Sequence, residues 1–208
     1  MGLKEALKKI WFFLWEEESI WSWIANVVLA FLIIKFLLYP GLGFVLGTPA
    51  PIVAVVSGSM EHDTSFDQYW SEPMCCNALC TKQTVQGQYY EMINISRAQF
   101  RDFGFVNGFN KGDIMILYSP KKVELGDVIV YVVPNRSDPV IHRVIRIEEK
   151  DGSKSYWTKG DHNCDVGDFE NQIQEDKVIG KAVWRVPLLG WVKIVAVWFW
   201  QAITGAFI

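Results

Sequence analysis

One long apolar segment constrains this chain more than any other feature. From Ile20 to Leu46 the only charged residue is Lys35, and the segment exceeds the roughly 20 residues that cross the core of a bilayer. The ends carry aromatic residues of the kind that collect at membrane interfaces: Trp21, Trp23 and Tyr39. We therefore expect a transmembrane helix over residues 19–40, ended by Pro40-Gly41.

The distribution of basic residues predicts how this helix is oriented. Three lysines precede it, Lys4, Lys8 and Lys9, whereas the first Lys or Arg after Lys35 is Lys82. Basic residues favour the cytoplasmic side of a membrane. We expect residues 1–18 to form a cytoplasmic amphipathic segment and residues 41–185 to form a domain outside the cytoplasm.

The C-terminal segment, residues 186–208, is also apolar, but Gly190 and Lys193 interrupt it. It reaches the length of a membrane span only if nearly all of it is used. A second transmembrane helix and a helix lying in the headgroup region are both open.

Charge excludes one class of function. The net charge is −3, with both signs mixed along the chain, so there is no basic stripe of the kind that neutralises nucleic-acid phosphates. We expect no nucleic-acid partner.

The middle of the chain predicts a mainly antiparallel β domain. Several segments are rich in β-branched residues and start after Gly-Asp or Pro, which is typical of strands, and Lys150-Asp-Gly-Ser153 is a hairpin turn signal. The expected strands lie at residues 48–56, 113–118, 127–133, 140–147, 155–159 and 178–186.

Residues 61–110 lack this pattern and have the character of an insert. The insert contains Cys75, Cys76 and Cys80, and Cys164 lies far along the chain. Four cysteines outside the cytoplasm can form two disulfides, with Cys76–Cys80 as one of several possible pairs. The Cys and His spacings match no zinc pattern, and we expect no metal and no cofactor.

Three groups suggest nucleophilic catalysis. Ser59 lies in the turn Ser57-Gly-Ser-Met60, and His142 lies on an expected strand and could accept its proton. The loop at residues 158–168 carries Asp161, Asp165 and Asp168, any of which could orient the imidazole. Each of these residues taken singly is also an ordinary turn or core residue.

In combination these motifs resemble a known family. The order of SGSM after a membrane helix, KGD, LGDVIVY, IHRVI and TKGD strongly resembles signal peptidase I of the archaeal and endoplasmic-reticulum type, serine peptidase family S26. The resemblance implies Ser59 as nucleophile and His142 as general base. It makes Asp168 the first choice for the acid and Asp161 a second important carboxylate, leaves Asp165 open, and suggests Ser57 for the oxyanion hole.

The resemblance also implies an activity and its setting. Such an enzyme removes signal peptides from secreted preproteins after small residues of the Ala-X-Ala type. The apolar strand of Ile52, Val53, Ala54, Val55 and Val56 would bind the peptide through its backbone. The partners would be preproteins, the lipid bilayer and unspecified accessory membrane subunits, in an archaeal cell membrane or an endoplasmic-reticulum membrane. The alternative is a noncatalytic membrane-anchored β domain.

Overall fold

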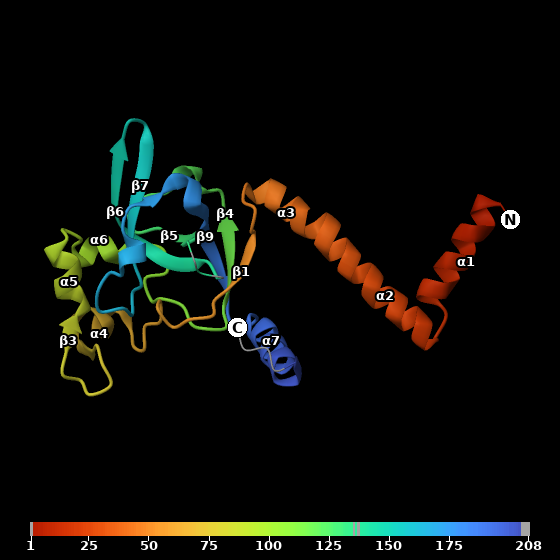
Figure 1. Ribbon diagram of the computed structural model, residues 1–208, viewed down its shortest axis with the longest axis horizontal. Helices are drawn as coiled ribbons and strands as arrows, with labels where there is room; N and C mark the ends of the chain where they lie inside the picture. Colours follow the sequence, from red (N-terminus) through yellow and green to blue (C-terminus); the bar gives the residue numbers. More distant parts are fainter. Residues whose placement is uncertain (1, 135, 137, 205–208) are drawn as a thin grey trace. The chain divides into compact units, whose positions relative to one another are not determined.

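The computed structural model describes residues 2–134, 136 and 138–204 (Figure 1). The chain divides into two compact units, residues 1–45 and residues 46–208. The first unit is helical, and the second contains a β-sheet, an insert and a C-terminal helix.

The first unit begins with an amphipathic helix that packs against the apolar one. Helix α1 (Leu3–Trp15) is joined to α2 (Ile20–Ile33) by a short turn. Ser22 donates a side-chain hydrogen bond to the carbonyl of Phe13, and Asn26 donates one to the carbonyl of Leu14, at 2.5 and 2.7 Å. These bonds satisfy carbonyls at the end of α1, where intrahelical partners run out.

The apolar helix runs farther than the sequence predicted. Helix α2 continues through a π-helical turn, η1 (Ile34–Leu38), into α3 (Tyr39–Leu46). The expected end at Pro40-Gly41 was therefore wrong. Proline lacks an N–H and breaks a regular α-helical ladder, but the π-turn directly before it changes the hydrogen-bond spacing so that the helix continues.

Length, composition and exposure of this helix fit a membrane span. The helix Ile20–Leu46 has a mean hydropathy of 2.2, and none of its most apolar 18-residue window is buried. A core helix of a soluble protein would be covered by other elements. The helix is long enough to cross a bilayer.

The second unit is built on a seven-stranded antiparallel sheet, which confirms the expected fold class. The strand order is β1-β4-β9-β5-β6-β7-β8. The strands are β1 (Ile52–Ala54), β4 (Ile114–Tyr118), β5 (Val128–Tyr131), β6 (Val140–Lys150), β7 (Ser153–Lys159), β8 (Ile173–Gln174) and β9 (Val178–Val186). Short 3-10 turns are η2 (Pro120–Lys122), η3 (Asp168–Glu170) and η4 (Glu175–Lys177).

The sheet buries apolar side chains on both faces. Along β6, Val140 and Val144 belong to one buried cluster and Ile141 to another, as the alternation of a strand requires. The predicted hairpin turn between β6 and β7 is confirmed, because Asp151 and Gly152 both have positive φ, 53° and 77°, as a type I′ turn needs.

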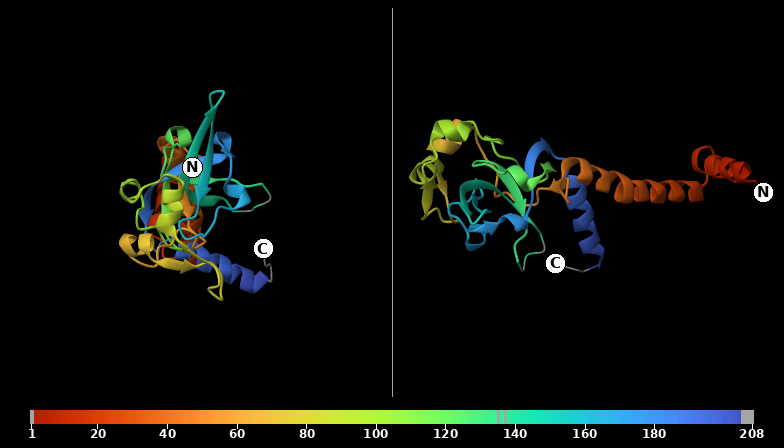
Figure 2. Two further views of the ribbon diagram at one scale, coloured as in Figure 1. Left: turned by 90° about the vertical axis from the view of Figure 1, so that its left-hand side faces the viewer. Right: turned by 90° about the horizontal axis from the view of Figure 1, so that it is seen from above.

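The insert forms a small aromatic subdomain beside β6 and β7 (Figure 2). It contains α4 (Phe66–Ser71), β2 (Pro73–Cys75), β3 (Gln83–Val85), α5 (Gln86–Met92) and α6 (Arg97–Arg101). Its core is closed by Ile145 of β6 and consists of Phe66, Tyr69, Trp70, Tyr90, Ile95 and Phe100.

Two disulfides connect the cysteines, and the pair Cys76–Cys80 is not one of them. Cys75 pairs with Cys80, and Cys76 pairs with Cys164, 88 residues away. The pairing depends on which sulfurs the hairpin β2–β3 presents to the loop after β7, and spacing does not reveal this.

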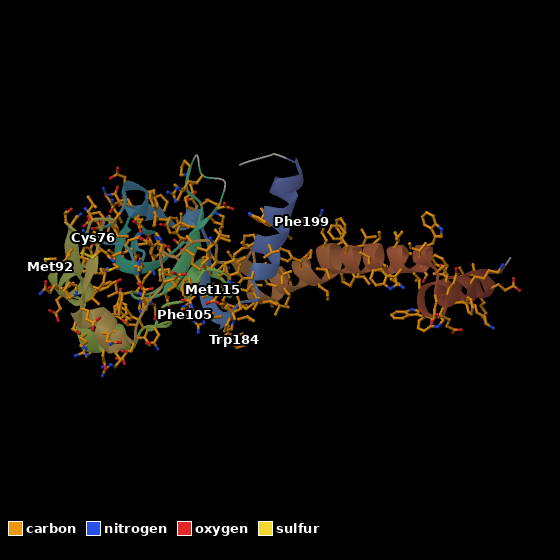
Figure 3. The ribbon with its side chains drawn as sticks, turned by 90° about the horizontal axis from the view of Figure 1, so that it is seen from below. Cys76, Met92, Phe105, Met115, Trp184 and Phe199 are labelled. Atoms are coloured by element: carbon orange, nitrogen blue, oxygen red, sulfur yellow. A yellow bond between two sulfur atoms is a disulfide. The ribbon has the colours of Figure 1, made fainter. Side chains whose placement is uncertain are left out.

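The chain continues after β9 into α7 (Trp191–Thr204), which has 14 residues. Trp184 on β9 and Phe199 on α7 are 73% and 61% exposed (Figure 3). The described part of α7 is shorter than the roughly 20 residues that cross a bilayer. Within the described part of the chain, Ile20–Leu46 is the one helix that has the length and hydropathy of a span.

Candidate active site

Ser59 lies in a turn that is anchored at both ends. The residues on either side, Val55 and Met60, are 1% and 0% exposed and belong to the same apolar core. Between them the chain must leave the core and return, and Ser57 and Ser59 lie at the surface of this turn with their hydroxyl oxygens 3.2 Å apart. The packing therefore presents a hydroxyl on a rigid support.

His142 lies directly against this turn. It projects from β6, is 4% exposed, and its Nε2 is 2.9 Å from Ser59 Oγ. The two residues are 83 positions apart in the chain. A neutral imidazole in this position can accept the serine proton, which is the arrangement of an activated nucleophile and its base.

Glu170 is the carboxylate that reaches the other side of the imidazole. Its Oε1 is 2.5 Å from His142 Nδ1, and the Glu170 side chain is 1% exposed. The contact has the distance of an ion pair, although it lacks the alignment of a hydrogen bond. The backbone N–H groups of Gly160 and Gly167 donate to the two carboxylate oxygens of Glu170 and hold it in place.

Sequence reasoning missed Glu170 because it lies two residues beyond the expected aspartate. Asp168 is exposed, and the structure does not bring it to His142. Both residues lie in the 3-10 turn η3, where successive side chains are about 120° apart, so they point in different directions. The spacing Gly167-x-x-Glu170 is that of a capping box, in which a glutamate side chain bonds to the backbone N–H three residues before it. This spacing was the sequence signal that could have placed Glu170 near the start of the turn.

The other two candidate aspartates have different partners. Asp165 is exposed and forms an ion pair with Lys82 of the insert. Asp161 is completely buried and contacts Arg143, the residue after His142, rather than His142 itself. Of the three predicted aspartates, the described structure brings none to the imidazole.

Asp161 and Arg143 form a buried pair whose polar groups are all satisfied. Arg143 donates through Nε and Nη2 to the carboxylate, and its other N–H groups reach three backbone carbonyls. His62 Nε2 and the Tyr90 hydroxyl supply further hydrogen bonds to Asp161, at 3.1 and 3.0 Å. Burial by itself would raise the pKa of Asp161, but the Arg143 charge and the hydrogen bonds from His62 and Arg143 hold it well below its usual range.

Lys159 is a second buried charge beside this pair. Its ammonium donates to the side chain of Gln86 and to the carbonyls of Gly160 and Asn163, at 2.8, 3.0 and 2.6 Å. Burial lowers the pKa of Lys159 to about 8. Lys159 bonds to the loop and not to Ser59, so the described contacts assign it to supporting the loop.

A groove leads to the Ser59–His142 pair. It has a volume of about 790 Å³ and is lined by strand β1, Ser57, Ser59, His142, Asn163 and Phe169, among others. Of the five residues expected to bind substrate, Ile52, Val53, Ala54 and Val56 line it. Val55 does not, because its side chain is part of the core and its backbone bonds to Asp113 and Gly112.

The edge of β1 that faces away from β4 is open for pairing. The carbonyl of Pro51 and the N–H of Val55 bond toward β4 and the loop before it, and Val53 is paired with Met115. Backbone groups alternate in direction along a strand, so those of Ile52 and Ala54 point away from the sheet. An extended peptide could add to the sheet there.

Comparison with known proteins finds homologues that share one name. No protein-family model matches the chain. It is 26% identical over 167 residues to the signal peptidase complex catalytic subunit SEC11 of Yarrowia lipolytica, covering 77% of this chain and 71% of that protein. The corresponding values for SEC11 of Eremothecium gossypii are 29% over 167 residues, 76% and 73%.

A shorter and more similar match is to the signal peptidase complex catalytic subunit SEC11C of Homo sapiens. It is 34% identical over 95 residues, which is 42% of this chain and 50% of that protein. The chain therefore matches half the length of this relative. Similarity to the SEC11 proteins, a serine beside a histidine and an apolar helix ahead of the sheet agree with one another: the homologues of this chain are catalytic subunits of the signal peptidase complex.

Proposed function

We propose that this protein is a serine endopeptidase that removes N-terminal signal peptides from exported preproteins. The observation that carries the proposal is the 2.9 Å contact between Ser59 Oγ and His142 Nε2, at the end of an open, largely apolar groove. The relatives that are named as catalytic subunits of signal peptidase support it.

The mechanism follows from the positions of the three side chains. His142 Nε2 takes the proton of Ser59 as Oγ attacks the scissile carbonyl, and then gives it to the departing amine of the mature protein. An acyl-enzyme on Ser59 remains, and water activated by His142 hydrolyses it. Glu170 keeps the ring oriented and stabilises its charged form, the role for which Asp168 and Asp161 were the sequence candidates.

The developing oxyanion needs hydrogen-bond donors near Ser59. We assign this role to the backbone N–H of Ser59 and the hydroxyl of Ser57, whose oxygen is 3.2 Å from Ser59 Oγ. Ser57 also lines the groove, so its hydroxyl can rotate toward a bound carbonyl.

The substrate is proposed to be an extended peptide with small residues, typically Ala-X-Ala, before the cut. The free backbone groups of Ile52 and Ala54 would pair with it, and the apolar side chains that line the groove would accept its small side chains. Such pairing uses backbone hydrogen bonds, so it tolerates varied side chains at the other positions of the substrate peptide.

We propose that the chain is anchored by Ile20–Leu46 with its N-terminus in the cytoplasm and its sheet outside, in an archaeal cell membrane or an endoplasmic-reticulum membrane. The two disulfides support an oxidising compartment for the second unit. Helix α7, with 14 residues, would lie at the membrane interface. Because the relatives are named as subunits of a complex, accessory membrane subunits are proposed partners beside preproteins and lipid.

The full chain in detergent, incubated with a preprotein that carries an Ala-X-Ala site, tests the activity. The wild type should cut after the second Ala, and Ser59→Ala and His142→Ala should each lower turnover by roughly a thousandfold or more. Ser71→Ala is the matched control, because Ser71 is exposed on α4 and its loss should change nothing. If the Ser59→Ala preparation cleaved at the wild-type rate, the cleavage would not come from Ser59. This result would favour a noncatalytic β domain.

A further inference from the structure

We propose that the insert, residues 61–110, is a positioning device for catalysis: it clamps the loop Lys159–Glu170 through the disulfide Cys76–Cys164 and through Gln86. Activity then depends on that disulfide being oxidised. This inference rests on the proposed peptidase function and adds to it a role for the insert.

The loop Lys159–Glu170 places two parts of the active site. Its His162 N–H donates to the carbonyl of Ser59 at 2.8 Å, so it supports the turn that carries the nucleophile. Its Gly160 N–H donates to Glu170, which faces His142. A shift of this loop would therefore move both the serine and the carboxylate relative to the imidazole.

The middle of the loop has no large apolar side chain to hold it, since Val166 and Phe169, which pack against two apolar clusters, both lie nearer its end. Asp165 and Asp168 are exposed, and His162, Asn163 and Cys164 are only partly buried. A segment of this composition does not gain enough from burial to fix its conformation. Its order must come from the elements that it contacts.

The insert supplies those contacts from several directions. Cys76 is bonded to Cys164 in the middle of the loop, and Figure 3 shows Cys76 at the end of the unit where the insert lies. Gln86 accepts from Lys159 Nζ at 2.8 Å and donates to the carbonyl of Asn163 at 3.1 Å. Tyr69 donates to the carbonyl of Asp161 at 2.9 Å.

The insert is itself a firm support. Tyr69, Tyr90 and Phe100 are buried against one another in an aromatic core that includes Ile145 of the sheet. Gly87 lies so close to Trp70 that an added Cβ would be 2.4 Å from the Trp70 carbonyl oxygen. Since interiors this dense do not deform freely, a covalent bond from this body to the loop restricts the loop.

The second disulfide provides a matched control within the same hairpin. Cys75–Cys80 closes a turn inside the insert, five residues apart, and both of its sulfurs belong to the insert. Removing it should leave the clamp in place, whereas removing Cys76–Cys164 should release the loop while leaving the strand β1 side of the groove unchanged.

The first experiment compares full-length Cys76→Ser/Cys164→Ser with Cys75→Ser/Cys80→Ser on the Ala-X-Ala preprotein. We expect the first variant to lose roughly tenfold or more in kcat, as displacements of about 1 Å in a catalytic group can cost this or more, with KM changed less than about threefold. We expect the second to keep kcat within about twofold. Equal kcat values for the two variants, or a loss confined to KM, would overturn the proposal.

A lower kcat in the first variant could also result from misfolding, so the second experiment breaks the disulfide in a protein that has already folded. In Cys75→Ser/Cys80→Ser only Cys76–Cys164 remains, so dithiothreitol acts on that bond alone. The disulfide Cys76–Cys164 is reduced to two thiols, and dithiothreitol supplies the two electrons and two protons and becomes its cyclic disulfide. Activity should fall on reduction and return on reoxidation, while circular dichroism stays constant.

The outcomes separate the two proposals. If the wild type does not cleave the preprotein, the peptidase function fails. If it cleaves and complete reduction of Cys76–Cys164 leaves kcat unchanged, or lowers it only in step with unfolding, the positioning role fails and the peptidase function stands.

Discussion

Replacing Asp161 by Ala tests whether this aspartate supports the fold or takes part in the chemistry. Asp161 and Arg143 are both 0% exposed. Removing the carboxylate leaves a guanidinium buried without its counter-ion, which costs roughly 3–5 kcal/mol. For a unit of this size each kcal/mol lowers Tm by about 2–4 °C, so we expect Tm to fall by roughly 6–20 °C.

The control is Asp165→Ala. Asp165 pairs with Lys82 at the surface, with both side chains more than half exposed, and such pairs contribute about 0–1 kcal/mol. Its Tm should fall by less than about 4 °C. Thermal unfolding in detergent, followed by circular dichroism, measures both variants under the same conditions.

Acid should reduce the difference between the wild type and Asp161→Ala. The pKa of Asp161 is held below its usual range in the folded protein, so the unfolded chain binds this proton first as the pH falls. The stabilisation is fully present above the ordinary aspartate pKa, about 4, and is lost as the pH falls through the folded value.

A different result would refute this reasoning. If Asp161→Ala kept the wild-type Tm within about 2 °C yet lost more than about a hundredfold in kcat well below Tm, Asp161 would be part of the chemistry. Its contacts to Arg143 would then be secondary.

Three further predictions concern the site, the loop and the anchor. Glu170→Gln keeps the size of the side chain but not its charge, and we expect kcat to fall roughly a hundredfold or more, whereas a change below about threefold would remove Glu170 from the mechanism. Lys159 has a pKa near 8 in the folded protein and a higher one unfolded, so between pH 8 and 10 the free energy of unfolding of the wild type should rise relative to that of Lys159→Met. Denaturant titrations measure it, and a constant difference contradicts the burial of the charge. Leu29→Arg puts a charge into the apolar helix and should raise the cost of insertion by about 2.5–3.5 kcal/mol, which alkaline extraction of membranes detects as released protein; full retention would count against the span.

The sequence predicted those elements whose signal is local. The apolar run, the β-branched segments and the Asp151-Gly152 turn each carry their own period or turn chemistry, and the helix, strands and hairpin appeared where they were expected. The end of the helix was wrong because a proline stops a helix only when the turns before it stay regular, and here a π-turn precedes Pro40.

The sequence did not predict which residues contact one another in the folded protein. The order of motifs singled out Ser59 and His142, but the carboxylate beside the imidazole is Glu170 and not Asp168, and Cys76 pairs with Cys164 and not with Cys80. Each of these depends on which way a side chain points after a turn of a few residues. A single step in a 3-10 turn rotates a side chain by about 120°, which is enough to exchange one partner for another.

The sequence by itself thus determined that this chain has a helix long and apolar enough to span a membrane, an antiparallel sheet and a serine and histidine in the order of a signal peptidase, because hydrophobic periodicity and motif order are properties of the chain. Only the tertiary structure decided that Arg143 pairs with Asp161, that Glu170 faces His142 and that Cys76 of the insert is bonded to Cys164 of the loop after β7. Those contacts join residues many positions apart, and their formation depends on packing that fixes direction as well as distance.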